Sequence, residues 1–246
     1  MPLTTDQALC IRVWDWSETS QTVSLFGRTT GVIRGVAKGA KRENARFSGG
    51  LEVLTRGEFI ASIKNTEQLA LLTAWDLQET FPAARASLSA FYAGMTMLDL
   101  VHHAVKDHDP HPALFDALLA SLRELGEPGR DTWALLSFLW TLLVETGHQP
   151  ELFQDAAGGE LTDARSYAFS ARLGGLTKDT PQSEGQGAGV WRVRAETVEL
   201  LRGLASWGAG IKEGDSAAAQ RATKLLALYF REVFACELPS MRGVLE

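Results

Sequence analysis

The sequence has 246 residues, of which 45% are hydrophobic and 22% charged, and its formal net charge is −6. This length and hydrophobic content favour one large folded domain or two small ones, and they exclude a disordered chain. The negative charge excludes a protein coated in positive charge, so any nucleic-acid site must be a local basic patch.

The cysteine content favours a protein of the reducing cytoplasm, and the hydropathy favours a protein without a secretory signal or a membrane span. The sequence contains only Cys10 and Cys236, which give no disulfide framework and no cysteine-based zinc site, and we expect both to be buried as small apolar residues. The N-terminal residues lack the basic region and apolar stretch of a secretory signal. The longest apolar run, residues 133–144, is shorter than the roughly 20 residues of a membrane span. We therefore expect a cytoplasmic protein that does not cross a membrane.

Residues 7 to about 77 carry a β pattern, in which short runs rich in Val, Ile, Thr, Leu and Trp are separated by glycines and polar turns. The expected strands are Ala8–Trp16, Thr22–Gly27, Gly31–Ala37, Leu51–Thr55, Gly57–Ser62 and Ala70–Leu77. Short strands in this number favour a small closed barrel, because closure removes exposed strand edges.

The barrel segment also carries a concentration of positive charge. Between residues 28 and 46 the single acid Glu43 stands against six basic residues, which are Arg28, Arg34, Lys38, Lys41, Arg42 and Arg46. We take these six as candidate DNA-binding residues, since small barrels bind single strands through basic grooves and stacking aromatics. Candidate stacking residues are Trp14, Trp16, Phe26 and Phe47, each of which could instead belong to the core. A solvated basic turn is the alternative for the charges.

Around Phe81 and Pro82 the pattern changes to apolar residues at helical spacing, as in Leu88, Phe91, Tyr92, Met95, Leu98 and Val101. Further helices are expected at Pro112–Leu125, Arg130–Glu145, Ala195–Trp207 and Ser216–Phe234. The fold class is therefore α+β, with a barrel over residues 1–79 and a helical domain over residues 80–246.

Helical periodicity disappears between Pro150 and Arg192, where glycines interrupt the chain repeatedly. We expect a loop-and-hairpin excursion from the helical domain over residues 150–192. Gly185 to Gly189 imitate part of a dinucleotide-binding fingerprint, but they lack the preceding apolar strand and the required spacing, so a flexible linker is expected.

Several sequence strings resemble those of the RecO recombination mediators. In the N-terminal part these are Leu9-x-x-Arg12-x-x-Asp15-x-Ser17-Glu18-Thr19-Ser20, Leu25-Phe26-x-Arg28-x-x-Gly31, Arg34-Gly35-Val36-Ala37-Lys38-Gly39-Ala40-Lys41-Arg42 and Arg46-Phe47. The later strings are Leu77-x-Glu79-x-Phe81-Pro82, Thr146-Gly-His-Gln-Pro150 and Pro239-Ser240-x-Arg242, and they match more loosely. The resemblance covers nearly the whole chain, and the string from Arg34 to Arg42 is its most specific part.

The resemblance implies an oligonucleotide-binding (OB-fold) barrel and a function in DNA repair and homologous recombination. It implies binding of single- and double-stranded DNA, annealing of complementary strands, and help in loading recombinase onto strands coated by the single-strand-binding protein. The implied partners are RecR and the acidic C-terminal tail of that binding protein, and the implied location is the cytoplasm, in association with the nucleoid. The family's basic positions match Arg28, Lys38, Lys41 and Arg42.

One departure concerns zinc. Many RecO proteins carry two Cys-x-x-Cys pairs that bind a structural zinc ion, and the corresponding positions in this chain are Asp155, Gly158, Thr177 and Thr180. Since four thiolates form a closed tetrahedral site and none is present, we expect no zinc and no other cofactor. The excursion should then be a metal-free hairpin or a mobile segment.

A different class of function would be a metal-dependent hydrolase built on the stretch from His102 to His111. His102 and His103 are adjacent, so on a helix they point about 100° apart, and the other candidate ligands follow in the Asp109–Pro110 turn. The sequence contains no phosphate-binding loop, no nucleophile elbow and no other catalytic set. We therefore expect no enzymatic activity and no catalytic residues.

The apolar stretch from Trp133 to Leu143 is expected to form a core helix. Its surroundings could instead form a pocket for a partner's tail, with Arg123 or Arg130 receiving a carboxylate. A third alternative is a protein adaptor that binds no DNA and whose basic loop docks an acidic partner.

Overall fold

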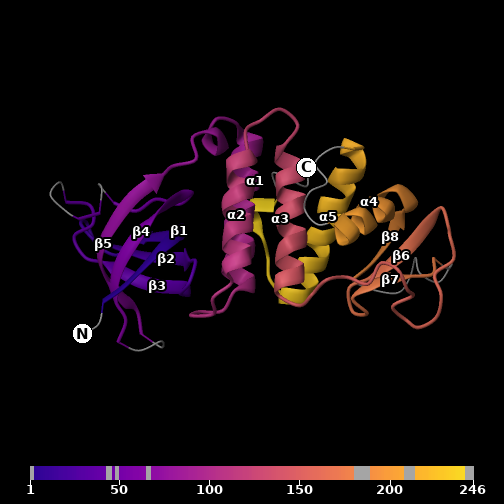
Figure 1. The fold of residues 1–246 in the computed structure, drawn as a ribbon, viewed down its shortest axis with the longest axis horizontal. Coiled ribbons are helices and arrows are strands. Elements are labelled where there is room, and N and C mark those ends of the chain that lie inside the picture. Colours follow the sequence, from indigo (N-terminus) through magenta and orange to yellow (C-terminus); the bar gives the residue numbers. More distant parts are fainter. Residues whose placement is uncertain are drawn as a thin grey trace.

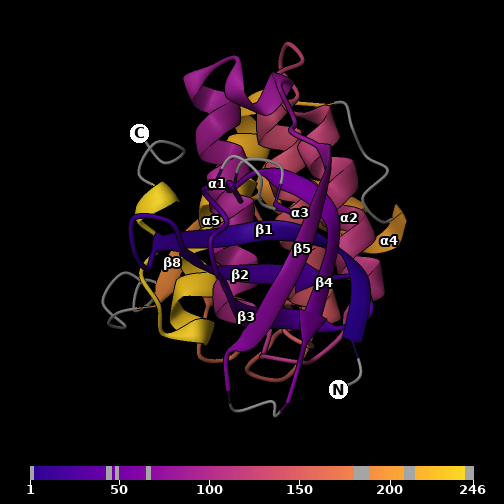
Figure 2. The same cartoon turned by 90° about the vertical axis from the view of Figure 1, so that its left-hand side faces the viewer.

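The computed structural model describes residues 3–42, 46–47, 50–64, 68–179, 189–207 and 214–241. The N-terminal strands are β1 (Leu3–Asp15), β2 (Gln21–Gly27), β3 (Gly31–Ala37), β4 (Thr55–Ser62) and β5 (Ala70–Glu79). They form a closed barrel in the order β1-β2-β3-β5-β4 (Figure 2). The expected OB-like barrel is thus confirmed.

β1 makes closure possible because it is long enough to pair with two neighbours. Its first part, Leu3 to Cys10, pairs with β4, and the part from Ala8 to Asp15 pairs with β2. A shift in register between Cys10 and Arg12 bends the strand between these two ladders. A short parallel pairing of β3 with β5 closes the ring. The β4 pairing explains why β1 begins at Leu3, earlier than the sequence pattern indicates.

The predicted strand at Leu51–Thr55 is wrong, since only Thr55 belongs to a strand. Leu51 and Leu54 are nevertheless fully buried. The side chain of Gln21 takes the place of a neighbouring strand, because its amide accepts a hydrogen bond from Leu51 N at 2.9 Å and donates one to Leu51 O at 3.1 Å. An apolar run can therefore fill the core without strand pairing when one side chain satisfies its backbone groups.

The helical part begins with a 3₁₀ turn at Ala83–Arg85 and continues with α1 (Leu88–Ala104), α2 (Pro112–Glu124) and α3 (Asp131–Glu145). After the excursion follow α4 (Ala195–Trp207), α5 (Ser216–Phe234) and a 3₁₀ turn at Pro239–Met241. These bounds agree with the predicted helices to within one residue at most ends. No helix of the described residues is long and apolar enough to cross a membrane.

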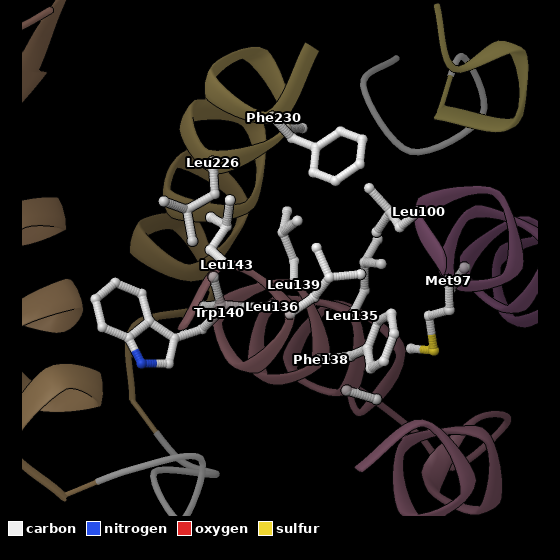
Figure 3. Packing of buried hydrophobic residues seen from close by; sticks show 14 of the residues in the cluster. Met97, Leu100, Leu135, Leu136, Phe138, Leu139, Trp140, Leu143, Leu226 and Phe230 are labelled. Atoms are coloured by element: carbon white, nitrogen blue, oxygen red, sulfur yellow. The ribbon is translucent and has the colours of Figure 1, made fainter. Parts of the chain in front are cut away.

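α3 is the centre of the helical core. Figure 3 shows its side chains between Met97 and Leu100 of α1 on one side and Leu226 and Phe230 of α5 on the other. The buried side chains of α3 occupy most of its circumference, from Trp133 to Leu143. This confirms the expected core helix. Its first turns, at Asp131, Thr132 and Leu135, line a surface hollow of about 200 Å³.

The barrel and the helices share one hydrophobic cluster. Leu9, Phe26 and Val32 of the barrel belong to the same cluster as Phe115 of α2, and the rings of Phe26 and Phe115 lie 5.8 Å apart. The barrel therefore packs directly against α1 and α2 (Figure 1).

The turn between β2 and β3 also contacts the helical part. Val32 forms a parallel bridge with Asp107 and accepts a hydrogen bond from His108 N at 3.0 Å. Gly31 has a φ of +70°, and a Cβ atom there would lie 2.4 Å from the carbonyl oxygen of Asp109. Only glycine allows the two backbones to approach this closely.

The excursion contains a small sheet of β6 (Ser166–Ser170), β7 (Gly175–Thr177) and β8 (Val190–Arg194), in the order β7-β6-β8. The Asp155 carboxylate connects two of its loops, accepting hydrogen bonds from Ala157 N at 2.8 Å and Lys178 N at 3.3 Å. Asp155 stands where the resemblance places a zinc-binding cysteine. Of the other three such positions, Gly158 and Thr177 are described, and Thr180 lies outside the described residues.

Candidate nucleic-acid interface

Two loops meet at the end of the barrel where β1 stops and β3 stops. The first, residues 16–20, joins β1 to β2, and the second, residues 38–42, follows β3. They are tied together by hydrogen bonds from Lys41 N to Thr19 O at 3.1 Å and from Gly39 N to Ser20 Oγ at 3.1 Å. The basic residues after β3 are therefore fixed beside the aromatic residue that follows β1.

Between these loops lies a surface hollow of about 350 Å³. Its lining includes the Trp16 side chain, 65% of which is exposed, together with Lys38 and Arg42. Neither Lys38 nor Arg42 has a carboxylate partner among the described residues, and both are exposed. An exposed indole beside two available cations can stack on a base while the cations contact phosphates.

Gly39 shapes the second loop. Its φ of +69° lies in the left-handed region, and its carbonyl oxygen accepts a hydrogen bond from Arg42 N at 3.1 Å. The resulting turn brings both Lys38 and Arg42 into the lining of the hollow.

Hydroxyl groups complete the hollow, and the sequence analysis did not assign them a binding role. Ser17, Thr19 and Ser20 all line it. Ser20 is buried and its hydroxyl is committed to Gly39 N. Hydroxyl donors commonly contact phosphates, and the string Ser17-Glu18-Thr19-Ser20 directly after an exposed tryptophan is the signal that could have indicated them.

Lys41 and Arg46 lie near this end of the barrel in different settings. The Nζ atom of Lys41 is 2.5 Å from Asp15 Oδ1 at the end of β1. Arg46 is exposed, and its backbone oxygen accepts a hydrogen bond from Trp75 N at 2.8 Å. The loop carrying Arg46 is thereby anchored to β5.

Arg28 and Arg34 are directed towards the helical part instead. Arg28 makes two hydrogen bonds to the carboxylate of Asp116 in α2, at 2.9 and 2.7 Å. Arg34 Nε lies 3.2 Å from Asp107 Oδ2 in the loop before α2. The Arg28 hydrogen bond lowers the pKa of Asp116 and keeps this carboxylate charged. The structure therefore separates the six predicted basic residues into two groups.

A buried carboxylate orders the turn that carries Arg28. Asp6 Oδ2 accepts hydrogen bonds from Thr29 N, Thr30 N and Thr30 Oγ1 at 2.8 to 2.9 Å. Asp6 is 8% exposed. The β2–β3 turn is thus held in one conformation, which directs Arg28 to α2.

The four candidate aromatic residues differ in how much of each is exposed. Trp14 and Trp16 are 49% and 65% exposed, whereas Phe26 and Phe47 are 0% and 4% exposed. Phe26 and Phe47 therefore belong to the core, and the stacking interpretation is wrong for both. Of the exposed pair, only Trp16 lines the hollow.

The alternative sites gain no geometric support. The described residues contain no group of three or more His, Cys, Asp and Glu side chains that could hold a metal ion, and all of residues 102–111 are described. Arg123 is bound to Glu79 at 2.7 Å and Arg130 to Glu124 at 3.1 Å, so both arginines beside α3 already have carboxylate partners. Cys10 is buried as expected, and Cys236 is only partly buried.

Comparison with known proteins shows two family matches that together span most of the chain. Residues 1–81 match the family described as Recombination protein O N terminal, and residues 85–241 match Recombination protein O C terminal. The curated relatives include the protein named DNA repair protein RecO of Rhodopirellula baltica, which is 30% identical over 81% of this chain and 74% of its own length. Proteins of the same name from Syntrophobacter fumaroxidans and Idiomarina loihiensis are 30% and 28% identical, over 81% and 82% of this chain and 77% and 82% of their own lengths.

Proposed function

Because the chain belongs to the RecO family of DNA repair and recombination proteins, we propose that its barrel holds single-stranded DNA at the hollow beside Trp16. Lys38 and Arg42 contact phosphates there, and Trp16 stacks on a base. The single observation that carries this proposal is the exposed indole in one hollow with two cations that have no carboxylate partners among the described residues.

The other candidate residues have supporting roles in this proposal. Lys41 and Arg46, which do not line the hollow, add positive charge to the same barrel. Arg28 and Arg34 hold the barrel against the helical domain through Asp116 and Asp107, and they contact DNA only where a phosphate reaches the exposed part of their side chains. Contacts of this kind carry little base information, so binding depends weakly on sequence.

Annealing follows from the same contacts, because cations that neutralise phosphates reduce the repulsion between two strands. Residues 80–246 would form the partner-binding domain, with RecR and the acidic tail of the single-strand-binding protein as partners. Recombinase loading would follow from displacement of that binding protein. No covalent bond is made or broken, so the proposal includes no catalytic residue, and it places the protein in the cytoplasm at the nucleoid.

The test is binding of a labelled single-stranded oligonucleotide across a salt series, for the wild type and for the Lys38→Ala, Lys41→Ala, Arg42→Ala triple variant. Each phosphate contact contributes about 0.7 to the slope of log affinity against log salt concentration. We expect the triple variant to bind more weakly and its slope to become shallower by about two.

A triple variant of exposed cations on the excursion, Arg165→Ala, Arg172→Ala, Lys178→Ala, removes the same charge far from the hollow and serves as the matched control. If both triple variants lose affinity equally, net charge and not the hollow determines binding. If the wild type does not bind at moderate salt, the adaptor alternative replaces the proposal.

A further inference from the structure

A hollow of about 260 Å³ lies at the end of the molecule opposite the barrel, where β8 meets α4 and α5 (Figure 1). We call it the β8 hollow. The apolar part of its wall is formed by Trp191 and Val193 of β8 and by Leu225 and Leu228 of α5. The Trp191 ring lies beside the fully buried ring of Phe169 in β6, at a centroid distance of 6.3 Å. The wall therefore includes an aromatic surface that a packed side chain supports.

Four cations surround this apolar wall. Arg192 and Arg194 come from β8, and Arg221 and Lys224 come from α5. Among the described residues, no acidic side chain lines the β8 hollow. In a chain with a net charge of −6, four cations around one apolar depression form a local positive field that attracts anionic groups.

Two of these cations are held in place and two remain available. Arg192 Nε lies 2.6 Å from Asp179 Oδ2, and Arg221 Nε donates a hydrogen bond at 3.1 Å to a threonine hydroxyl of α4. Arg194 and Lys224 are exposed and have no carboxylate partner within the parts of the chain that the structure describes. An arginine and a lysine that are both available can bind phosphate oxygens, the first through paired N–H donors and the second as a point charge.

The β8 hollow follows the edge of its strand. All of residues 191–194 line it, although successive side chains point to opposite faces of a strand. Ala195 N donates a hydrogen bond to Arg165 O at 3.1 Å, on the side of β6. Because backbone groups alternate in direction along a strand, the N–H of Arg194 points away from β6, to the edge where no described strand pairs with β8. This edge therefore supplies a backbone hydrogen-bond donor beside the apolar wall.

Wall and rim together distinguish between classes of small ligand. A simple anion would leave the apolar wall in water, and an uncharged aromatic ligand would leave Arg194 and Lys224 without an anionic partner. A nucleotide uses both features, because its base covers Trp191 while its phosphates reach the cations. The polar edges of the base can bind the Arg194 N–H and the guanidinium donors of the rim.

We propose that the β8 hollow binds a phosphorylated nucleoside, with the base on the apolar wall and the phosphates on Arg194 and Lys224. The ligand has two sources with this same chemistry, a free nucleotide and the 5′-phosphorylated end of a DNA strand. The site binds its ligand without making or breaking a covalent bond. It goes beyond the proposed DNA contacts at Trp16 and does not depend on them, since it lies at the other end of the molecule.

The experiment measures fluorescence anisotropy of ADP that carries a fluorophore on its ribose. The full chain is titrated as wild type and as the Arg194→Glu, Lys224→Glu variant. Both positions are exposed, so the variant should keep the circular dichroism spectrum of the wild type. We expect its dissociation constant to rise at least about tenfold, since two attractive contacts become repulsive.

The control variant Arg172→Glu, Lys178→Glu makes the same charge change on exposed residues of the excursion outside the β8 hollow and should bind labelled ADP as the wild type does. Equal binding by the two double variants would overturn the proposal.

Unlabelled competitors test the two halves of the site separately. ADP should displace the labelled ADP at a concentration at least about tenfold lower than adenosine or pyrophosphate does, because only ADP contacts both the wall and the cations. Displacement by pyrophosphate at the same concentration as ADP would reduce the site to a cluster of cations. Displacement by adenosine at that concentration would reduce it to an apolar contact, and either result would overturn the proposal.

Oligothymidine competitors with and without a 5′ phosphate separate the two sources. They are added to the Lys38→Ala, Lys41→Ala, Arg42→Ala variant, in which the proposed barrel contacts are removed. Displacement by the phosphorylated strand alone supports the site and assigns it to strand ends, whereas displacement by ADP and by neither strand supports the site and assigns it to free nucleotides. Equal displacement by both strands would show a general DNA surface and overturn the proposal. Failure of labelled ADP to bind a wild type that still binds oligothymidine would overturn the nucleotide site and leave the proposed DNA function intact.

Discussion

The proposed DNA contact depends most on one side chain, that of Trp16, and its neighbour Trp14 provides the comparison. Both indoles are exposed, but Trp14 belongs to β1 whereas Trp16 follows its end, where the backbone of the loop is fixed by hydrogen bonds from Trp16 N and Ser17 N to Ser20 O. A rigid loop that presents a large apolar side chain to solvent loses the free energy that burial would supply. A ligand that covers the indole recovers it.

Trp16→Ala should weaken binding of a single-stranded oligonucleotide by about 1 to 3 kcal/mol, the range measured for base stacking on aromatic side chains. The circular dichroism spectrum and the denaturation midpoint should not change, because the side chain has little packing to lose. Trp14→Ala is the matched control and should weaken binding much less, since Trp14 does not line the hollow. Equal losses for the two variants would contradict the assignment of Trp16.

The sequence alone could indicate the positive segment but not how its members divide. Arg28 and Arg34 are paired with Asp116 and Asp107, which lie more than 70 positions further along the chain. Local charge patterns contain no information about such distant partners. The burial of Phe26 has the same origin, because its contact with Phe115 forms only when α2 packs against the barrel.

Among the elements, the excursion combines buried apolar residues such as Phe169 and Leu176 with one carboxylate that joins two of its loops. The Asp155 carboxylate reaches both the turn at Ala157 and the strand end at Lys178. Ala156 N also donates to Leu176 O at 2.8 Å. These contacts join the same two loops that paired thiolates would join through a metal ion in the zinc-binding relatives implied by the resemblance.

Asp155→Ala should accelerate amide hydrogen exchange at Ala157 and Lys178 by about ten- to a hundredfold, since each loses its acceptor and the local opening becomes easier. Asp155→Asn should restore protection at only one of the two amides, because an amide side chain offers one oxygen. Hydrogen exchange with mass spectrometry or nuclear magnetic resonance measures both. Treatment of the wild type with EDTA should leave exchange unchanged, and faster exchange on chelation would show that a metal contributes.

Elements whose burial follows a regular period were predictable from the sequence, and those ordered by a single side chain were not. β4 alternates buried and partly exposed residues along its whole length, and α4 and α5 begin and end where the pattern indicates. The segment at Leu51 has the composition of a strand, yet Gln21, 30 positions earlier, satisfies its backbone groups. The sequence pattern did not predict β8, the third strand of the excursion, because its partner strand β6 is distant in the sequence.

At the scale of the whole molecule, the barrel and the helical part are joined by a shared apolar cluster and by ion pairs around it. Arg12 of β1 lies 2.7 Å from Asp99 of α1, and Asp99 also accepts a hydrogen bond from Ser240 near the C-terminus. A barrel that is bound in this way cannot turn freely against its helices. The hollow beside Trp16 is therefore held in a fixed orientation relative to the helical part.

Glu79 provides a test of this connection, since it ends β5 and binds cations from both parts. Its carboxylate accepts hydrogen bonds from Arg123 of α2 at 2.8 and 2.7 Å and from Arg56 of β4 at 3.0 Å. The Arg123 hydrogen bond, followed by that of Arg56, lowers the pKa of Glu79 below that of a free carboxyl group. A lowered pKa in the folded state means that this carboxylate stabilises the fold at all pH values above the ordinary carboxyl range.

Glu79→Gln should therefore reduce the free energy of unfolding near pH 7 by about 1 to 2 kcal/mol, a value discounted because Arg123 is half exposed. The difference between wild type and variant should stay constant down to about pH 5 and shrink as the pH falls through the lowered pKa, where wild-type Glu79 also becomes neutral. Urea denaturation across this pH range, followed by the fluorescence of the seven tryptophans and by helical circular dichroism, measures this difference.

Glu52→Gln is the control. It changes an exposed carboxylate 3.8 Å from Arg85 and should change stability by less than about 0.5 kcal/mol. A Glu79→Gln effect that persists unchanged to pH 3 would mean that the lost contact is not ionic, and separate fluorescence and dichroism transitions would mean that the barrel and the helices unfold independently.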